Sequence, residues 1–134
     1  MLRIVGLLVL LVHGGCAAAA ADNAGGGTQI RVTDVKSIAG RWAGLSDLPG
    51  HRNDDQYIEV TLRDDGSYEA TSARTIGLMD RQGRVQISDG RLLIHGSNGA
   101  SGTATLYSTA GEPTLLVQMD GAKGGATARL RPKP

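Results

Sequence analysis

The sequence predicts an all-β protein built from short antiparallel strands. Apolar and polar residues alternate along residues 57–63, which is the period of a strand with one buried face. Asp64-Asp65-Gly66 and Asp89-Gly90 are hairpin-turn signals that separate such segments. Glycine contributes 20 of the 134 residues, a content that disfavours helices. These three observations indicate a chain of hairpins.

Eight strands are expected between residues 30 and 134. They fall at residues 37–44, 57–63, 67–73, 84–88, 91–95, 103–107, 114–119 and 126–131. Ile30, Val32 and Val35 precede them as an extended approach or a turn of helix. Eight sequential strands can close into an up-and-down barrel, which leaves no unpaired strand edge. A two-sheet β-sandwich is the alternative, because strand number and turn spacing do not decide closure.

Trp42 is the expected centre of the core. It is the only tryptophan in a chain that contains no phenylalanine. A tryptophan can bury on the order of 200 Å² of surface. Gly40 and Gly44 flank it and allow a neighbouring backbone to approach closely. We therefore expect Trp42 to anchor the first strand of the barrel.

The pair Gly40-x-Trp42, together with a basic residue late in the last strand (Arg129 or Arg131), resembles the calycin superfamily of lipocalins, avidins and related small barrels. The resemblance implies that the tryptophan closes one end of the barrel and that an arginine lies across its ring. Such a cation–π contact contributes about 0.5–2 kcal/mol. The chain is shorter than a lipocalin and lacks the helix before the final segment. The whole pattern is also similar to that of small exported bacterial β-barrel domains.

The N-terminus has the features of an export signal. A basic lead ending in Arg3 precedes the apolar residues 4–12, a run too short to cross a bilayer as a helix. Gly14-Gly15-Cys16 then resembles the end of a bacterial lipoprotein signal peptide, although His13 stands where an aliphatic residue is usual. The resemblance implies removal of residues 1–15 and acylation of Cys16, with palmitate among the usual chains. The alternative is an ordinary signal peptide cut within residues 17–21.

Three segments follow from this interpretation: a signal peptide at 1–15, a tether at 16–29 and a barrel domain at 30–134. The tether is rich in alanine and glycine and has no large apolar residue to bury until the barrel begins. We expect the protein in the bacterial cell envelope, at the outer membrane through the lipid on Cys16. A soluble periplasmic or secreted protein is the alternative. With Cys16 as the only cysteine, no internal disulfide can form.

No residue pattern indicates catalysis, a metal or a cofactor. His51 and Asp54 could form half of a metal site, but no third ligand is evident. His95 ends an expected strand, and the aspartates at 64, 65 and 89 are explained by their turns. The formal charge of +1 gives no basic field for nucleic acid. We therefore expect a protein that is not an enzyme.

Two functions remain. The first is a monomeric interaction or structural module that binds an unidentified envelope protein. The second is a binder of a small apolar ligand inside the barrel, with Tyr68, Leu106 and Tyr107 lining the interior. The volume of the interior distinguishes these two functions. Small inward residues such as Ala70 and Ala104 are compatible either with a cavity or with a narrow barrel that is filled. Few aromatic residues are present to grip a ligand, which favours the first function.

Overall fold

The computed structural model describes residues 27–47, 56–72, 79–120 and 125–134. These residues form nine strands and one 3₁₀ turn. The elements are β1 (Thr28–Ile30), η1 (Val35–Ile38), β2 (Gly40–Asp47), β3 (Gln56–Leu62), β4 (Ser67–Ser72), β5 (Gln82–Ser88), β6 (Arg91–Gly96), β7 (Ser101–Thr109), β8 (Glu112–Met119) and β9 (Ala126–Pro132). Within these ranges no helix is both long and apolar enough to span a membrane.

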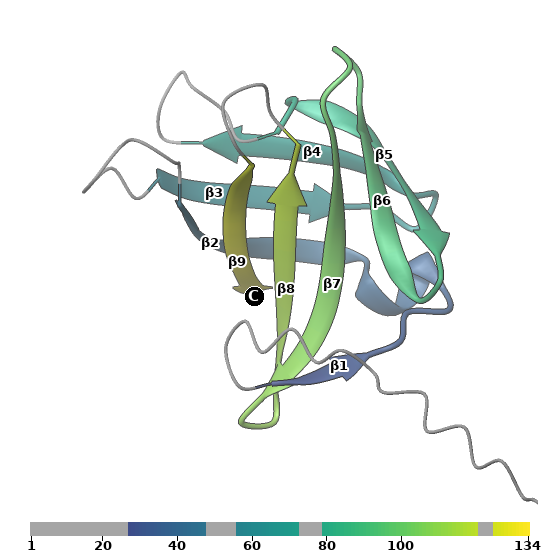
Figure 1. Cartoon of the computed structure of the whole chain (residues 1–134), viewed down its shortest axis with the longest axis vertical. Coiled ribbons are helices and arrows are strands. Elements are labelled where there is room, and N and C mark those ends of the chain that lie inside the picture. The colour runs from purple at the N-terminus through teal and green to yellow at the C-terminus, as the bar shows by residue number, and fades with distance from the viewer. Residues whose placement is uncertain (1–26, 48–55, 73–78, 121–124) are drawn as a thin grey trace, which may run out of the picture.

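Strands β2 to β9 close into an eight-stranded antiparallel barrel. Each strand pairs with the next along the chain, and β2 also pairs with β9. The closing seam places Gly44 opposite Leu130 and Leu45 opposite Arg129. In Figure 1, β2, β3 and β4 run across the view behind the upright β7, β8 and β9. The predicted all-β barrel is therefore confirmed, and the sandwich alternative is not formed.

The turns explain where the strands begin and end. Asp89 and Gly90 have φ angles of 51° and 76°, as a two-residue type I′ hairpin requires. Ala110 and Gly111 form a second turn of this kind, with φ angles of 51° and 82°. Because this turn has only two residues, Thr109 pairs with Glu112. Strand β8 therefore begins two residues before the expected position.

Strand β1 was not expected. It pairs with β7, with Thr28 opposite Ser108 and Ile30 opposite Leu106. Strand β6 pairs with β7 only up to Ala104, so β1 takes the part of the β7 edge that β6 does not reach. Thr28 and Gln29, which fall in the tether predicted at 16–29, thus form the start of an extra strand on the edge of β7.

The segment between β1 and β2 lies against one end of the barrel. The amide of Val32 donates to the carbonyl of Gly90, 2.9 Å away, in the β5–β6 turn. Asp34 caps η1 by accepting a hydrogen bond from the amide of Lys36 at 2.9 Å. Val32 and Ile38 are both buried in the core. The first expected strand therefore starts at Gly40, because the preceding residues form a turn over the core.

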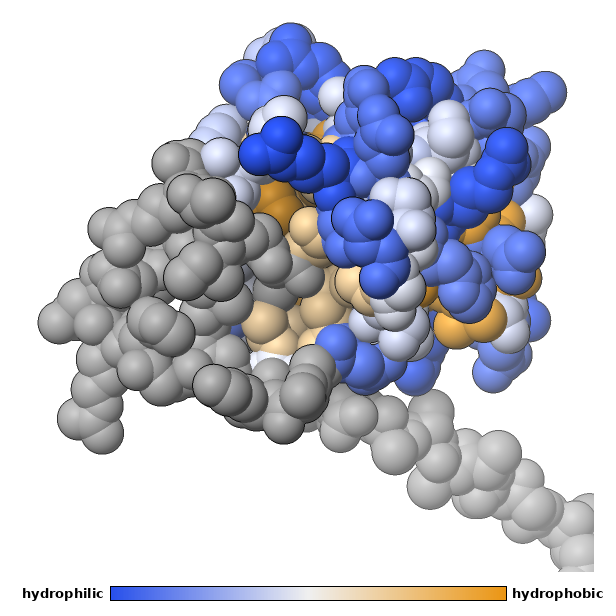
Figure 2. Space-filling model, turned by 90° about the horizontal axis from the view of Figure 1, so that it is seen from above, coloured by the Kyte–Doolittle hydropathy of each residue, from blue (hydrophilic) through white to orange (hydrophobic). Residues whose placement is uncertain are grey.

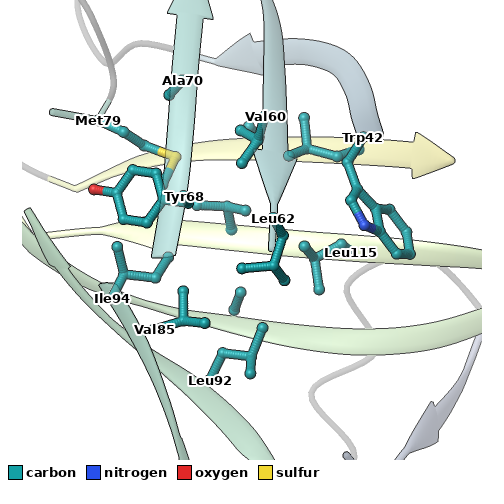
Figure 3. Close-up of a cluster of buried hydrophobic side chains, with 14 of the residues drawn as sticks. Trp42, Val60, Leu62, Tyr68, Ala70, Met79, Val85, Leu92, Ile94 and Leu115 are labelled. Atoms are coloured by element: carbon teal, nitrogen blue, oxygen red, sulfur yellow. The ribbon is translucent and has the colours of Figure 1, made fainter. Parts of the chain in front are cut away.

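Trp42 is buried in the core, as predicted. Its side chain is 5% exposed, and its indole Nε1 donates a hydrogen bond to the carbonyl of Ile38 at 2.9 Å. Figure 3 shows the ring at one side of the apolar cluster, close to Leu62 and Leu115. The same hydrogen bond ties η1 to β2. Trp42 therefore links the end of the barrel to its first strand.

The C-terminus is attached to the outside of the barrel by Glu59. Lys133 Nζ lies 2.7 Å from Oε2 of Glu59, and the Arg41 guanidinium contacts Oε1 of the same carboxylate. The Lys133 amide also donates to the Arg41 carbonyl at 2.8 Å. The hydrogen bond from Lys133, followed by that from Arg41, lowers the pKa of Glu59 below its ordinary value. These contacts join β2, β3 and the C-terminus.

We predict that Trp42→Ala lowers the free energy of unfolding by about 3–5 kcal/mol, the usual cost of truncating a large core side chain. Urea titration followed by circular dichroism measures this change. Leu45→Ala removes an exposed apolar side chain from the same strand and serves as the control. A loss below about 1 kcal/mol for Trp42→Ala would show that the ring is not an anchor.

Ala110→Asn should raise the free energy of unfolding by about 0.5–1 kcal/mol. Ala110 holds a positive φ that asparagine tolerates better, and Asn-Gly is the preferred type I′ pair. Asp89→Ala places alanine at the equivalent position of the β5–β6 turn and should shift stability in the opposite direction. Thermal and urea unfolding of both variants test the pair. Equal signs for the two changes would contradict this account of the turns.

Glu59→Gln should lower the Tm at neutral pH and have no effect in strong acid. Because the folded-state pKa of Glu59 is lowered, its contribution to stability is complete above the unfolded-state pKa and is lost as the pH falls through the folded-state value. Thermal melts from pH 7 downwards measure the difference. Glu112→Gln is the matched control, since Glu112 has only an exposed contact of 3.8 Å with Arg131. A difference in Tm that persists in strong acid would refute the assignment.

Candidate functional site

Among the described residues, the barrel interior is apolar and closely packed. A cavity of about 20 Å³ in this part of the interior is lined by eleven described residues, none of which carries a charge. They are Val60, Leu62, Tyr68, Met79, Val85, Leu92, Ile94, Ala104, Leu115, Val117 and Leu130. A single water needs about 10–15 Å³, whereas ligand pockets measure about 300–1,000 Å³. This cavity is therefore too small for a ligand of that class.

The small inward residues do not leave the barrel hollow. Ala70, Ala104 and Ala128 are 6%, 2% and 1% exposed, and each belongs to the packed core. Figure 2 looks onto the barrel from above and shows apolar atoms bordered above and to the right by hydrophilic ones. Among the described residues, these alanines are therefore packed into the core, beside a cavity of only about 20 Å³.

Tyr68 is the one interior residue with an unsatisfied polar atom among those described. Its side chain is 1% exposed, and its hydroxyl has no hydrogen-bond partner. Burial, followed by the nearby charge of Asp80, raises the pKa of Tyr68 to about 12. Figure 3 shows Met79 beside the ring, and Gly83 stands directly opposite Tyr68 on β5. A Cβ at Gly83 would lie 2.7 Å from the Tyr68 hydroxyl, so only glycine leaves room for this ring.

The three expected lining residues do not share one face. Tyr68 and Leu106 are buried in the core, but Tyr107 is half-buried and lies on the outside of β7. Successive residues of a strand point to opposite faces, so neighbours such as Leu106 and Tyr107 cannot both point inward. The prediction that Tyr107 lines the interior was wrong.

The expected contact between Trp42 and an arginine is not formed. Arg129 and Arg131 are exposed on the outer face of β9, while Leu130 between them is fully buried. The cation–ring contact found among the described residues is that of Lys133 Nζ with Tyr57, at 5.8 Å from the ring centroid. The indole instead pairs with the Ile38 carbonyl. Gly40 has a φ of 137°, which glycine permits at the bend between η1 and β2.

The described ranges contain no cluster of three or more residues able to hold a metal ion. His95 is exposed on the outer face of β6. Asp65 accepts hydrogen bonds from the amide and hydroxyl of Ser67 at 2.9 and 2.6 Å, which lower the pKa of Asp65. The pattern around His51 and Asp54, like Cys16, lies outside the ranges given above.

Asp80 has a structural role that the sequence did not indicate. Its Oδ2 accepts hydrogen bonds from the amides of Asn98 at 2.8 Å and Ala100 at 3.2 Å. The same carboxylate packs against Gly96, where a Cβ would overlap it. Asp80 therefore fixes the β6–β7 turn from a position that is distant in the sequence, and no local motif marks such a role.

A groove of about 330 Å³ lies on the outer face of β3 and β4 and the start of β5, between Glu59, Thr61, Glu69, Ala70, Thr71, Arg81 and Gln82. Both of its carboxylates are already paired. Glu59 binds Arg41 and Lys133, and Glu69 accepts a hydrogen bond of 2.6 Å from Arg63. Carboxylates that are already held in ion pairs are poor candidates for an acid–base pair. This groove is polar surface without an evident reaction.

A smaller depression on the outer face of β7, β8 and β9 contains Tyr107, Arg129 and Arg131. The structure thus brings three of the predicted site residues together on the outside of the barrel, although none of them acts as expected. No family model matches the sequence, and searches of curated proteins and of solved structures found no match either.

Proposed function

We propose that this protein is a non-enzymatic interaction or structural module of the bacterial cell envelope, which recognises an envelope partner through its outer surface. The observation that carries the proposal is the interior cavity of about 20 Å³. Because the core side chains fill the described interior, a partner would bind to the outer face of the barrel or to the loops between its strands. The calycin-like part of the proposal rests on the closed eight-stranded barrel and on the buried Trp42.

Attachment to the membrane is the second part of the proposal. Export rests on the apolar run at residues 4–12, and lipidation rests on Cys16 directly after two glycines. Eleven residues, 17–27, lie between Cys16 and the start of β1 at Thr28. A flexible chain of that length has an end-to-end distance of roughly 17–20 Å, enough to hold the barrel close to a membrane surface.

Binding of a small apolar ligand is the alternative. Tyr68 favours this alternative, because its buried hydroxyl has no hydrogen-bond partner among the described residues. An unpaired buried polar group in a folded protein calls for an explanation, and an absent ligand is one. A ligand with a hydrogen-bond acceptor would satisfy this hydroxyl. Such a ligand would also have to displace core side chains, since the cavity beside the ring is about 20 Å³.

Lipidation is tested by expressing the full chain in a bacterial host and measuring its detergent partitioning and intact mass. We expect partition into the detergent phase and a mass that begins at an acylated Cys16. Cys16→Ser should abolish both, whereas the neighbouring Ala17→Ser should preserve them. Unchanged partitioning of Cys16→Ser, or a mass that lacks residue 16, would reject the anchor.

Binding of an apolar ligand is tested on the full chain expressed in the bacterial host. The measurements are native mass spectrometry and titration with a fluorescent fatty acid. The proposal expects no stoichiometric binding of the apolar probe. Saturable binding that Tyr68→Phe weakens at least about tenfold, the scale of one lost buried hydrogen bond, would replace the proposal with the ligand-binding alternative.

A further inference from the structure

The depression on the outer face of β7, β8 and β9 has the composition of an anion site. It has a volume of about 80 Å³, and we call it the arginine groove. Its residues are Gly27, Tyr107, Thr109, Thr114, Leu116, Arg129 and Arg131. In Figure 1 this face of the barrel is turned toward the viewer, with β1 crossing its lower edge.

The strand register explains why these groups meet. Arg129 and Arg131 are two positions apart on β9, so their side chains leave the same face at a spacing of about 7 Å. On the neighbouring strand Leu116 stands opposite Arg129, and Thr114 pairs with Tyr107 of β7. Leu116 is only 8% exposed although it lies on the outer face. The groove therefore has an apolar floor with guanidinium and hydroxyl groups around it.

The positive charge of the arginine groove is only partly compensated. Arg131 Nη1 lies 3.8 Å from Oε2 of Glu112, and both side chains are about 70% exposed. A pair of that length and exposure is weak. Arg129 has no ion pair with any described residue, and its partners across the sheet are Leu45 and Leu116. Of the two guanidinium groups, only that of Arg131 has a carboxylate partner among the described residues, and that pair is loose.

We propose that the arginine groove binds a phosphoryl group or an equivalent tetrahedral oxyanion. The arginine fork matches such an anion with two parallel hydrogen bonds, and the hydroxyls of Tyr107, Thr109 and Thr114 supply further donors. A volume of about 80 Å³ holds several water-sized groups but not a drug-sized molecule. The groove therefore fits the charged end of a ligand whose remainder stays outside.

The phosphoryl group can belong to an anionic lipid headgroup or to a soluble phosphate compound. Gly27, which lines the groove, is eleven residues from Cys16. A chain of that length spans at most about 36–40 Å, so a lipid on Cys16 would keep the groove near headgroups. The site itself is built from β7, β8 and β9 and does not depend on lipidation of Cys16.

The test uses the mature chain with Cys16→Ser, which removes any contribution of a lipid anchor. One arm titrates inorganic phosphate and glycerol 1-phosphate at constant ionic strength and follows amide chemical shifts by NMR. The other arm measures sedimentation with vesicles of phosphatidylcholine alone or mixed with phosphatidylglycerol. We expect saturable shifts that map to β8 and β9 in the first arm, or sedimentation that requires the anionic lipid in the second.

The variant Arg129→Gln/Arg131→Gln should weaken binding at least about tenfold, the effect of losing charge-assisted hydrogen bonds. Arg84→Gln/Arg91→Gln is the matched control, because it removes the same charge from exposed positions on β5 and β6. Loss in the groove variant alone supports the site, and the responding arm identifies the source of the phosphoryl group. Equal loss in both variants, or no binding in either arm, overturns the proposal. Unchanged NMR dispersion of the groove variant shows that it is folded.

Discussion

The closure of β2 against β9 is the interaction on which the rest of the barrel depends. Six residue pairs join the two strands, from Trp42 with Pro132 to Asp47 with Thr127. Gly44 lies within this seam, and a Cβ there would overlap the backbone carbonyl of Arg129. Glycine therefore lets the last strand approach the first. Without the seam both strands would present unpaired edges, and the core around Trp42 would open to solvent.

Closure also decides which residues can act inside the barrel and which outside. Once one side chain of a strand is known to point into the barrel, the pleat assigns the face of all the others. Leu130 is fully buried, so Arg129 and Arg131 must lie outside, away from the indole. Leu106 likewise places Tyr107 outside. The alternation that keeps Arg129 and Arg131 away from Trp42 is thus the same one that places them in the arginine groove.

Alternation and turn chemistry were enough to predict the strands, because both are local signals. Residues 57–63 and the turn Asp89-Gly90 carry them clearly. Strand β1 has only three residues and shows no alternation of buried and exposed side chains. It is formed because β7 extends beyond β6. The role of Asp80 depends on turn amides about twenty residues away. The expected arginine–tryptophan contact is not formed because Leu130 points inward, and the alternation along β9 therefore turns Arg129 and Arg131 outward.

The energy of the core argues for recognition on the outer surface. Widening the interior from about 20 Å³ to the 300 Å³ of a small ligand pocket would cost on the order of 7 kcal/mol, at about 24 cal/mol per Å³ of cavity. That is comparable with the roughly 5–15 kcal/mol that stabilises a whole domain. Satisfying the Tyr68 hydroxyl would return only about 1–3 kcal/mol. An anion in the arginine groove requires no such opening, because its guanidinium groups are already exposed at the surface.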